Sequence, residues 1–395
     1  MKNRSWLIPF FCLFILILLC FNFFNLPVYC LALDNSKSYS DLPYIECEST
    51  AKAMCVLEQK TGRILYGKNI NLKLPMASTT KIFTALTVLE RCKNIDALVN
   101  VNDKAVGIKG TSIYLRKGEK LTVKELLYGM MLPSGNDAAT ALAYYVGKDI
   151  PNFCKIMETT ARNAGAKSSE FKNPHGLDET GHYTTAYDLA KVSAKLMQNE
   201  VFKQIVTTRY AQIRGNNEIK TRYLKSKNKL LCKFPGCTGI KTGFTDDAGR
   251  CFVGSASREN LDVVCSVLNC GPMFEETAKF MELAFKEYKN YEIVPAYNII
   301  NNVNVVKGKE PSVKTFSRKS FCFPLTNEEF MKINYEYSLP EFLTAPIKKE
   351  QKIGNLKIYL EDKLLFQDEI LTKDKVISNS FLQTIKDFIK KWEVV

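Results

Sequence analysis

Residues 75–86 read Pro-Met-Ala-Ser-Thr-Thr-Lys-Ile-Phe-Thr-Ala-Leu, and the rest of the chain can be read outward from them. Ser78 stands where a helix should begin. Apolar residues then recur at three- and four-residue steps, a helical period, at Ile82, Phe83, Leu86 and Leu89. Residues i and i+3 share one face of a helix, so the spacing predicts that the Lys81 amine lies beside the Ser78 hydroxyl.

A serine and a lysine in this arrangement can form a nucleophile and its base. A serine hydroxyl is a poor nucleophile until a neighbouring base takes its proton. A lysine can be that base when burial or nearby cations lower its pKa, and a helix N-terminus stabilises a developing alkoxide. Most Ser-x-x-Lys sequences are nevertheless an N-cap serine followed by a surface lysine, so the pair needs support from other motifs.

A second motif, Ser134-Gly135-Asn136, follows an apolar helical pattern over residues 126–132. Gly135 permits a tight turn that presents both flanking side chains to one side. The Ser134 hydroxyl can relay a proton between a lysine and a leaving amine, and the Asn136 amide can hold a substrate backbone group. Taken alone, the tripeptide indicates only a turn.

A third motif is Lys241-Thr242-Gly243, followed by Phe244-Thr245. On a strand, Lys241, Gly243 and Thr245 share one face. Gly243 leaves room for a substrate backbone beside the strand, and the cation and the hydroxyls suit a carboxylate. The alternative is an edge strand with a solvated lysine.

The patterns around these motifs predict an α+β fold. Strand patterns occupy residues 53–57, 64–66, 239–242, 250–256 and 261–268, the first two as a hairpin. Helical patterns occupy residues 82–89, 126–131, 138–146, 185–198 and 274–288. Strands at both ends with helices between them predict a mostly antiparallel sheet with a helical cluster packed on it. We assign this catalytic domain to residues 46–290 and a β-rich domain to residues 291–376.

The composition and charge of the chain limit the classes of protein and of binding partner. The 395 residues carry 55 Lys and Arg against 41 Asp and Glu, a net charge of +14. The length predicts two or three domains, and the ordinary composition and mean hydropathy of −0.13 exclude disordered, collagen-like and multispan membrane chains. The basic excess suits nucleic acid, an anionic membrane surface or an anionic polymer.

The N-terminus favours export. Lys2 and Arg4 precede an apolar run, and Cys30-Leu31-Ala32 offers a cleavage site, which predicts a signal peptide over residues 1–32 and a linker over residues 33–45. The alternative is an uncleaved anchor helix. Cleavage removes two basic and no acidic residues, so the mature chain keeps +12. An exported chain meets no duplex DNA, so nucleic acid drops out as a partner.

The C-terminal residues 377–395 predict an amphipathic helix. Apolar residues at helical steps form a single stripe, namely Phe381, Leu382, Ile385, Phe388, Ile389 and Trp392. Lysines occupy much of the rest, which is typical of a helix lying in a membrane interface. We predict that residues 378–395 bind an anionic membrane surface; the alternative is a helix docked on the β-rich domain.

Cysteine and histidine usage is less specific. Ten cysteines follow the predicted signal peptide, and export permits disulfides. Cys232 with Cys237 and Cys265 with Cys270 are close in sequence, but buried free thiols are an equally good interpretation. His175 and His182 lack a metal-binding spacing, so we predict no metal site and no cofactor.

The three motifs, in this order, are the signature of serine penicillin-binding proteins and class A β-lactamases. The flanking residues resemble the low-molecular-mass D-alanyl-D-alanine carboxypeptidases in particular, through residues 75–81, 131–139, 171–178 and 239–245. This resemblance covers about residues 45–290. The β-rich segment and the tail also resemble that family's second domain and membrane anchor. It implies a β-lactamase/transpeptidase-like catalytic domain.

The resemblance implies roles for the nucleophile and its partners. Ser78 would form the acyl-enzyme, Lys81 would be the acylation base, and Ser134 would shuttle the proton. Asn136 would hydrogen-bond the substrate. It also puts His175 near the site, where we interpret it as a structural turn residue.

The third motif would bind the substrate's end. Lys241 and Thr242 would hold the terminal carboxylate, with Gly243 and Thr245 as further substrate-binding positions. The oxyanion hole would be formed by the backbone amides of Ser78 and Phe244.

The implied activity is removal of the terminal D-alanine from peptidoglycan stem peptides ending in D-Ala-D-Ala, with β-lactams acylating the same serine. A β-lactamase would need a deacylating Glu in a Glu-x-x-Leu-Asn loop, and no such pentapeptide occurs between Asn136 and Lys241. A transpeptidase or endopeptidase stays open, as does a wall-binding scaffold. We expect the exported chain at the outer face of the cytoplasmic membrane or in the wall.

Overall fold

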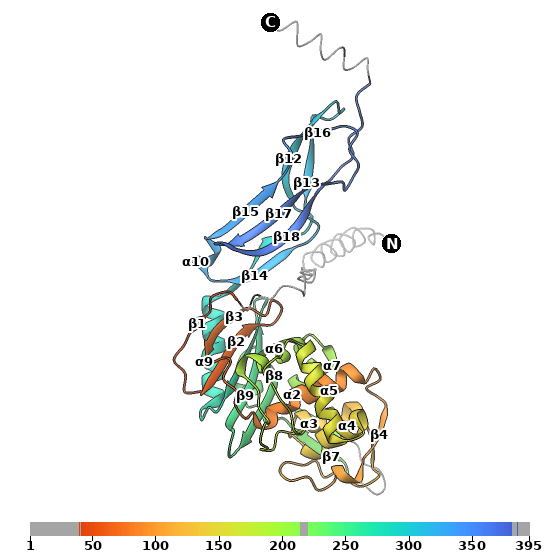
Figure 1. Cartoon of the computed structure of the whole chain (residues 1–395), viewed down its shortest axis with the longest axis vertical. Coiled ribbons are helices and arrows are strands. Elements are labelled where there is room, and N and C mark those ends of the chain that lie inside the picture. The colour runs from red at the N-terminus through yellow and green to blue at the C-terminus, as the bar shows by residue number, and fades with distance from the viewer. Residues whose placement is uncertain (1–38, 40, 214–219, 381–384, 386–395) are drawn as a thin grey trace, which may run out of the picture.

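The computed structural model describes residues 39, 41–213, 220–380 and 385. The predicted signal peptide, most of the linker before residue 41 and most of the predicted tail helix lie outside these residues. The molecule is elongated, with a helix-covered sheet at one end and a β-rich part at the other (Figure 1). In the part of the chain that is described, no helix is both long enough and apolar enough to cross a membrane.

A six-stranded sheet forms the centre of the larger part, in the order β1-β3-β2-β10-β9-β8. Its strands are β1 Ile45–Glu46, β2 Ala53–Glu58, β3 Ile64–Lys68, β8 Cys237–Thr245, β9 Gly249–Arg258 and β10 Leu261–Leu268. All neighbours are antiparallel except β1 and β3. The predicted hairpin over residues 53–66 is confirmed as the β2–β3 pair.

The sheet is buried on both faces because each strand alternates between two apolar clusters. In β2, Ala53, Cys55 and Leu57 enter the cluster under the helices, whereas Met54 and Val56 enter the cluster under α9, Met273–Glu287. This two-residue period is the pleat of a strand. The uninterrupted apolar run of β10 fits a central strand covered on both sides.

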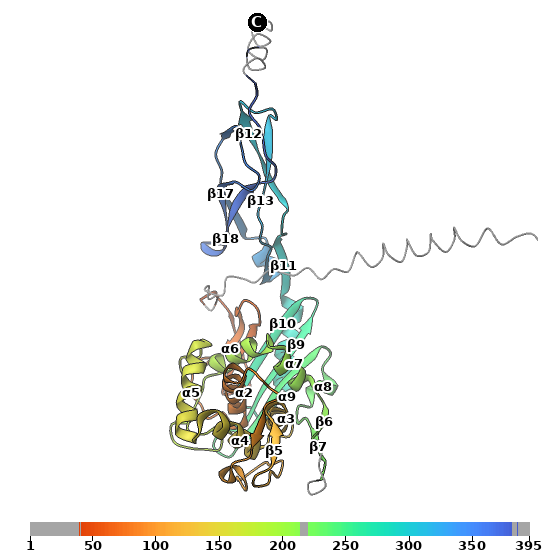
Figure 2. The ribbon, with the colours of Figure 1, turned by 90° about the vertical axis from the view of Figure 1, so that its right-hand side faces the viewer.

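The helices of the other face surround α2, Thr80–Arg91, which is buried from Thr80 to Val88. They lie together on one side of the sheet (Figure 2). Their bounds are α3 Val123–Met131, α4 Asn136–Gly147, α5 Ile150–Asn163, α6 Ala186–Met197 and α7 Glu200–Thr207. The helical patterns predicted for residues 82–89, 126–131, 138–146, 185–198 and 274–288 are confirmed.

Two of these helices were not predicted. α5 begins after Asp149, whose carboxylate accepts the backbone N–H of Asn152, a standard N-cap. Its buried residues Phe153, Cys154, Met157 and Ala161 follow the helical period, so the signal was present in the sequence. α7 is short and also begins at an N-cap, Asn199.

Short elements complete the larger part. They are the 3-10 turns η1 Ala77–Thr79 and η2 Asp103–Ala105, the pairs β4 Leu98–Asn100 with β5 Lys120–Thr122 and β6 Tyr210–Ile213 with β7 Arg222–Lys225, and α8 Leu230–Lys233.

The β-rich part contains a sheet in the order β15-β17-β18-β13-β12-β16 and a two-stranded sheet of β11 and β14. Its elements are β11 Lys289–Val294, β12 Ile299–Val306, β13 Ser312–Phe316, β14 Phe321–Leu325, α10 Asn327–Phe330, β15 Ile333–Ser338, β16 Phe342–Thr344, β17 Lys352–Leu360 and β18 Lys363–Thr372. Phe321 and Phe323 pack against Leu356, Ile358 and Ile370 between the two sheets. The α+β class, with a following all-β domain, is confirmed.

None of the ten cysteines among the described residues forms a disulfide. Cys55, Cys154, Cys251, Cys265 and Cys270 are buried. Burial therefore raises the pKa of Cys251 to about 12, which makes this thiol unreactive.

Arg63 joins the two parts of the molecule. Its side chain is fully buried, and its guanidinium donates to the carbonyl of Pro324 and pairs with the Glu329 carboxylate. The guanidinium also lies 5.3 Å from the ring centroid of Tyr288 and 5.6 Å from that of Phe323. Arg63, the residue directly before β3, thus holds α10 and β14 of the second part against the first part.

We predict that Arg63→Ala lowers the free energy of unfolding by about 3–5 kcal/mol, because it leaves a half-buried carboxylate and a carbonyl without their donor. Lys60→Ala is the matched control: Lys60 pairs with Asp262 from a position where its side chain is 51% exposed, which is worth about 0–1 kcal/mol. Urea unfolding of both variants is the measurement. Equal losses in the two variants would contradict the prediction.

Candidate active site

Ser78 and Lys81 are brought together at the start of α2. Ser78 lies in η1, and Lys81 in the first turn of the buried helix. The Nζ atom of Lys81 lies 2.9 Å from Oγ of Ser78. It also donates to Oδ1 of Asn136 at 2.7 Å and to the carbonyl of His175 at 2.8 Å. Three separate segments therefore converge on one amine.

The surroundings of Lys81 favour its neutral form. The side chain is completely buried, and the pKa of Lys81 is well below its usual value, chiefly because of burial and then because of the charges of Lys241 and Lys227. Asp137 acts in the opposite direction. Burial disfavours an ammonium ion and nearby cations disfavour it further, so the site supplies a lysine that can accept a proton.

Ser134 and Asn136 lie at the start of α4. Ser134 has a positive φ of 72°, a conformation that costs a non-glycine residue free energy. Its buried Oγ has no hydrogen-bond partner among the described residues. Asn136 instead uses both ends of its amide, accepting from Lys81 and donating to the carbonyl of Lys109 at 2.7 Å.

Asp137 holds this loop in place and was missed in the sequence. Its buried carboxylate accepts from the Ser112 hydroxyl at 2.6 Å and from the backbone N–H groups of Ile113 and Leu115. Several hydrogen bonds to one carboxylate satisfy its buried charge. The segment over residues 112–115 is thereby fixed against the motif that carries Ser134. A charged residue directly after Ser-Gly-Asn, inside an apolar helix, was the available signal.

Lys241 lies behind the cleft on β8. Its side chain is 1% exposed, and its amine donates to the carbonyl of Thr242 at 2.9 Å. Burial lowers the pKa of Lys241 to about 7, with Lys227 contributing. The amine can therefore gain or lose its charge near neutral pH.

Gly243 brings β8 against η1. A Cβ atom at this position would lie 3.0 Å from the backbone nitrogen of Ser78 and 3.1 Å from that of Thr79. The absence of a side chain allows the strand and the turn to approach this closely. The next residue, Phe244, is 63% exposed. Its backbone N–H belongs to the strand segment that faces the start of α2.

A cleft of about 750 Å³ opens over these residues. Its walls include Ser78, Ser134, Thr242, Gly243 and Phe244. Three site residues are not part of the wall. Lys81 hydrogen-bonds to Ser78 of the wall and to Asn136 behind it, and Lys241 directly precedes Thr242 in the chain. Thr245 lies outside the wall, and its hydroxyl donates to Asp178 at 2.7 Å and accepts the N–H of Ala248. A direct substrate contact by Thr245 stays a prediction.

The loop over residues 173–178 closes the site from the other side. Pro174 and His175 offer their carbonyls to Thr84 and Lys81. The ring Nδ1 of His175 accepts the N–H of Leu177, which is a turn contact. Burial, with Lys81, lowers the pKa of His175 to about 3, so the ring is neutral. The backbone of His175, and not its ring, touches Lys81.

The cleft is also lined by cations that the sequence did not single out. They are Lys225, Lys227, Lys229 and Arg250. Lys227 donates to the hydroxyl of Thr111 at 3.1 Å, and Arg250 pairs in register with Phe244 on the neighbouring strand. No aspartate or glutamate is among the described residues that line the cleft. The cleft therefore suits an anionic ligand. The signal was the run Lys225-Ser-Lys-Asn-Lys229.

Comparison with known proteins identifies the family of the chain. A family profile described as D-alanyl-D-alanine carboxypeptidase matches residues 39–271, and one described as the C-terminal domain of penicillin-binding protein 5 matches residues 288–378. The family is one of serine-type peptidases, and in this chain a partly exposed serine, Ser78, lies beside the buried Lys81. The chain belongs to the D-alanyl-D-alanine carboxypeptidase family.

Individual relatives extend over most of the chain. The D-alanyl-D-alanine carboxypeptidase DacF of Bacillus subtilis is 31% identical over 356 residues, which cover 88% of this chain and 91% of that protein. A crystal structure of penicillin-binding protein 5 from Haemophilus influenzae is 25% identical with a TM-score of 0.65, covering 84% and 99% of the two chains. The Streptomyces K15 DD-transpeptidase structure is 32% identical with a TM-score of 0.57, covering 61% of this chain and 99% of that one.

We predict that Gly176→Ala disrupts the site through a steric overlap, in addition to the strain of placing an alanine at a φ of +88°. A Cβ atom at Gly176 would overlap the carbonyl oxygen of Ala77 and meet Oγ1 of Thr80 at 2.7 Å, so the loop must move and take the His175 carbonyl away from Lys81. Penicillin acylation should slow at least about tenfold. Gly118→Ala is the control, because Gly118 also has a positive φ but has nothing within 4 Å of a Cβ.

The control variant should cost about 1 kcal/mol of stability and leave the acylation rate unchanged. Stopped-flow acylation and thermal unfolding measure the two effects separately. Equal acylation rates in the two variants would contradict the role given to the loop.

Proposed function

We propose that Ser78 is the nucleophile of a D-Ala-D-Ala carboxypeptidase and that the neutral Lys81 amine is its base. The observation that carries this proposal is the set of three partners around Nζ of Lys81. A neutral amine has two N–H donors and one lone pair. The two carbonyl-type oxygens, of Asn136 and His175, can only accept and use both donors. The lone pair is left for the Ser78 hydroxyl.

The reaction then follows from these positions. Ser78 attacks the carbonyl carbon between the two D-alanines while its proton moves to Lys81. The backbone N–H groups of Ser78 and Phe244 stabilise the oxyanion. The proton passes through the Ser134 hydroxyl to the leaving nitrogen, the C–N bond breaks, and D-alanine departs. Water then hydrolyses the ester and restores the Ser78 hydroxyl.

Substrate binding uses the polar groups near the cleft. We assign the terminal carboxylate to Lys241 and Thr242, with Arg250 as a further cation supported by its place in the cleft wall. Asn136 has a second amide hydrogen that Lys109 does not use, and this hydrogen would bind a substrate carbonyl. The β-lactam ring would acylate Ser78 by the same route.

Transpeptidation is the second candidate, supported by the similarity of this chain to the Streptomyces K15 DD-transpeptidase. Only the acceptor differs, a peptide amine in place of water.

We also propose the division into residues 46–290, 291–376 and 377–395, the cleavage of residues 1–32, and a location at the outer face of the cytoplasmic membrane with residues 378–395 as anchor. The profile matches and the relatives' names support an exported wall enzyme.

Fluorescent penicillin and a D-Ala-D-Ala peptide test the catalytic proposal together. We expect wild type to be labelled and to release D-alanine, and Ser78→Ala to do neither. Lys81→Met should lower the acylation rate by about 10²–10⁴, the usual contribution of a general base. Ser317→Ala is the control variant, because Ser317 is a buried serine of the β-rich part.

The outcomes separate the alternatives. Equal labelling of wild type and Ser78→Ala would refute the nucleophile. Labelling without D-alanine release would leave a penicillin-binding scaffold, and rapid loss of label would indicate a β-lactamase. Release that depends on an added amine acceptor would favour the transpeptidase.

The lowered pKa of Lys241 predicts a pH dependence of substrate binding. Lys241 is charged below pH about 7 and loses its charge above it, so the KM for a peptide with a free terminal carboxylate should rise as the pH increases through about 7. The same peptide with a terminal amide should show no such rise. Lys227 lowers the pKa of Lys241, so Lys227→Gln should move the rise to higher pH.

Steady-state kinetics from pH 6 to pH 9 provide the measurement. Identical KM profiles for the carboxylate and the amide peptides would mean that Lys241 does not bind the carboxylate. If the KM of Lys227→Gln rises at the same pH as that of wild type, a group other than Lys241 is responsible for the rise.

A further inference from the structure

One end of the β-rich part is formed by three loops that bind one another. They are residues 306–314, 345–351 and 372–379. Lys309 N donates to the carbonyl of Ile377 at 3.0 Å, and Asn379 N donates to that of Lys307 at 2.8 Å. Ile347 and Val376 exchange two backbone hydrogen bonds. We call this surface the lysine-rich end, and it lies opposite the helix-covered sheet (Figure 1).

Seven lysines cluster on these loops, namely Lys307, Lys309, Lys314, Lys348, Lys349, Lys373 and Lys375. All seven are exposed, and none takes part in an ion pair with another described residue. Their backbones, in contrast, are fixed by the hydrogen bonds between the loops. The seven lysines are therefore placed at one end of the β-rich part, and none of them is ion-paired with another described residue.

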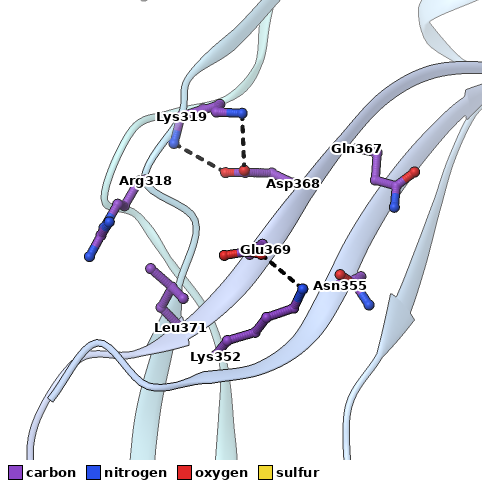
Figure 3. A pocket seen from close by; sticks show the side chains of 8 residues that line it. All are labelled: Arg318, Lys319, Lys352, Asn355, Gln367, Asp368, Glu369 and Leu371. Carbon is purple, nitrogen blue, oxygen red and sulfur yellow. Dashed lines mark hydrogen bonds and ion pairs between the residues drawn. The ribbon is translucent and has the colours of Figure 1, made fainter. Parts of the chain in front are cut away.

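The lysines in the middle of the same part behave differently. Lys319 and Lys352 line a groove of about 470 Å³ and point to Asp368 and Glu369, with which they pair at 3.6 and 2.8 Å (Figure 3). Lys332 and Lys357 likewise pair with Glu361 and Glu336. These four lysines are thus ion-paired, whereas the seven of the lysine-rich end are not paired with another described residue.

The local charge balance at the lysine-rich end is positive. Three acidic residues lie on or beside the loops, Glu310, Glu341 and Asp374. A fourth, Glu350, pairs with Arg318, so this pair adds no net charge. Seven lysines against three carboxylates leave an excess of four positive charges. Like charges at this spacing repel one another, so an anionic surface placed against them is stabilised.

Apolar side chains are exposed among these lysines. Ile377 is 50% exposed, Phe342 is 55% exposed and Val306 is 40% exposed. Val306 and Phe342 belong to the adjacent strands β12 and β16, of which β16 is at the edge of the sheet. Ile377 lies in the loop bonded to Lys309. Basic and apolar side chains together are typical of surfaces that rest on a membrane interface.

We propose that the lysine-rich end is a membrane-contact surface that binds anionic phospholipid headgroups independently of the terminal segment. This proposal rests on the proposed location outside the cytoplasmic membrane. The chain leaves the described structure at this end, after Ser380, toward the lysine- and aromatic-rich residues 381–395. The headgroup phosphates would meet the lysines, and the three apolar side chains would enter the interface.

The consequence is a second, electrostatic contact beside the predicted tail anchor. Each lysine near an anionic surface contributes about 1 kcal/mol, or about fivefold in affinity. The contribution is screened by salt, because the Debye length is only about 8 Å at 0.15 M ionic strength. Two contacts at one end of an elongated molecule restrict its tilt, which a single terminal helix does not.

Partition onto phosphatidylcholine vesicles, with and without phosphatidylglycerol, tests the proposal on the chain that begins at residue 33. The variant carries Lys307→Gln, Lys309→Gln, Lys348→Gln and Lys375→Gln. The matched control carries Lys93→Gln, Lys120→Gln, Lys155→Gln and Lys203→Gln, four exposed lysines of the catalytic part without ion pairs. Both variants have the same net charge.

We expect the lysine-rich-end variant to lose on the order of a hundredfold in affinity for anionic vesicles, with a smaller loss at high salt, and the control to change little. Neither should change on neutral vesicles. Deleting residues 381–395 should instead weaken binding to both kinds of vesicle, so a failure of the tail proposal is seen separately. D-alanine release from a soluble peptide reports the catalytic proposal in the same samples.

Equal affinities of the two quadruple variants for anionic vesicles would overturn the proposal. So would loss of binding to soluble poly(glycerol phosphate) with unchanged vesicle binding, because the surface would then recognise an anionic wall polymer. Thermal unfolding of both variants verifies that the lysine replacements act on the surface and not on folding.

Discussion

The amine of Lys81 connects the start of α2 with two other segments, and the active site is built around this connection. Its partners come from η1, from the start of α4 and from the loop over residues 173–178. Placing an ammonium ion in such an interior costs several kcal/mol, whereas a neutral amine with two acceptors is well satisfied. The same burial that makes the residue expensive as a cation makes it useful as a base.

Close backbone contacts provide the precision that this arrangement needs. Gly243 lets β8 lie against η1, and Gly176 lets the 173–178 loop reach Ala77. Asp137 fixes the loop over residues 112–115 by accepting from three donors, one hydroxyl and two backbone N–H groups. None of these residues is assigned a chemical step. Each one determines where a reacting atom or a carbonyl lies, and a displacement of about 1 Å can cost a hundredfold in rate.

Sequence reasoning found the side chains that carry chemistry because their spacing is local. The Ser78–Lys81 step is about one helical turn, and the short apolar, β-branched runs of β2, β9 and β10 predict strands. It did not find the contacts that depend on the tertiary structure. The acceptor at His175 is a backbone carbonyl, which residue identity does not encode, and the guanidinium of Arg63 reaches a partner 266 residues away. α5 was missed although Asp149 and Pro151 mark its start.

The fold also separates the lysines that contribute to the net charge of +14 into buried and exposed groups. Lys81 and Lys241 are both buried. After burial, the charges of Lys241 and Lys227 lower the pKa of Lys81, and the charge of Lys227 lowers the pKa of Lys241. In the cleft, positive charge therefore favours neutral amines, and in the proposed function it also attracts one carboxylate. The lysines at the far end of the β-rich part are solvated and keep their full charge, so they act at long range and collectively. Burial thus separates the two lysines proposed for the active site from those of the lysine-rich end.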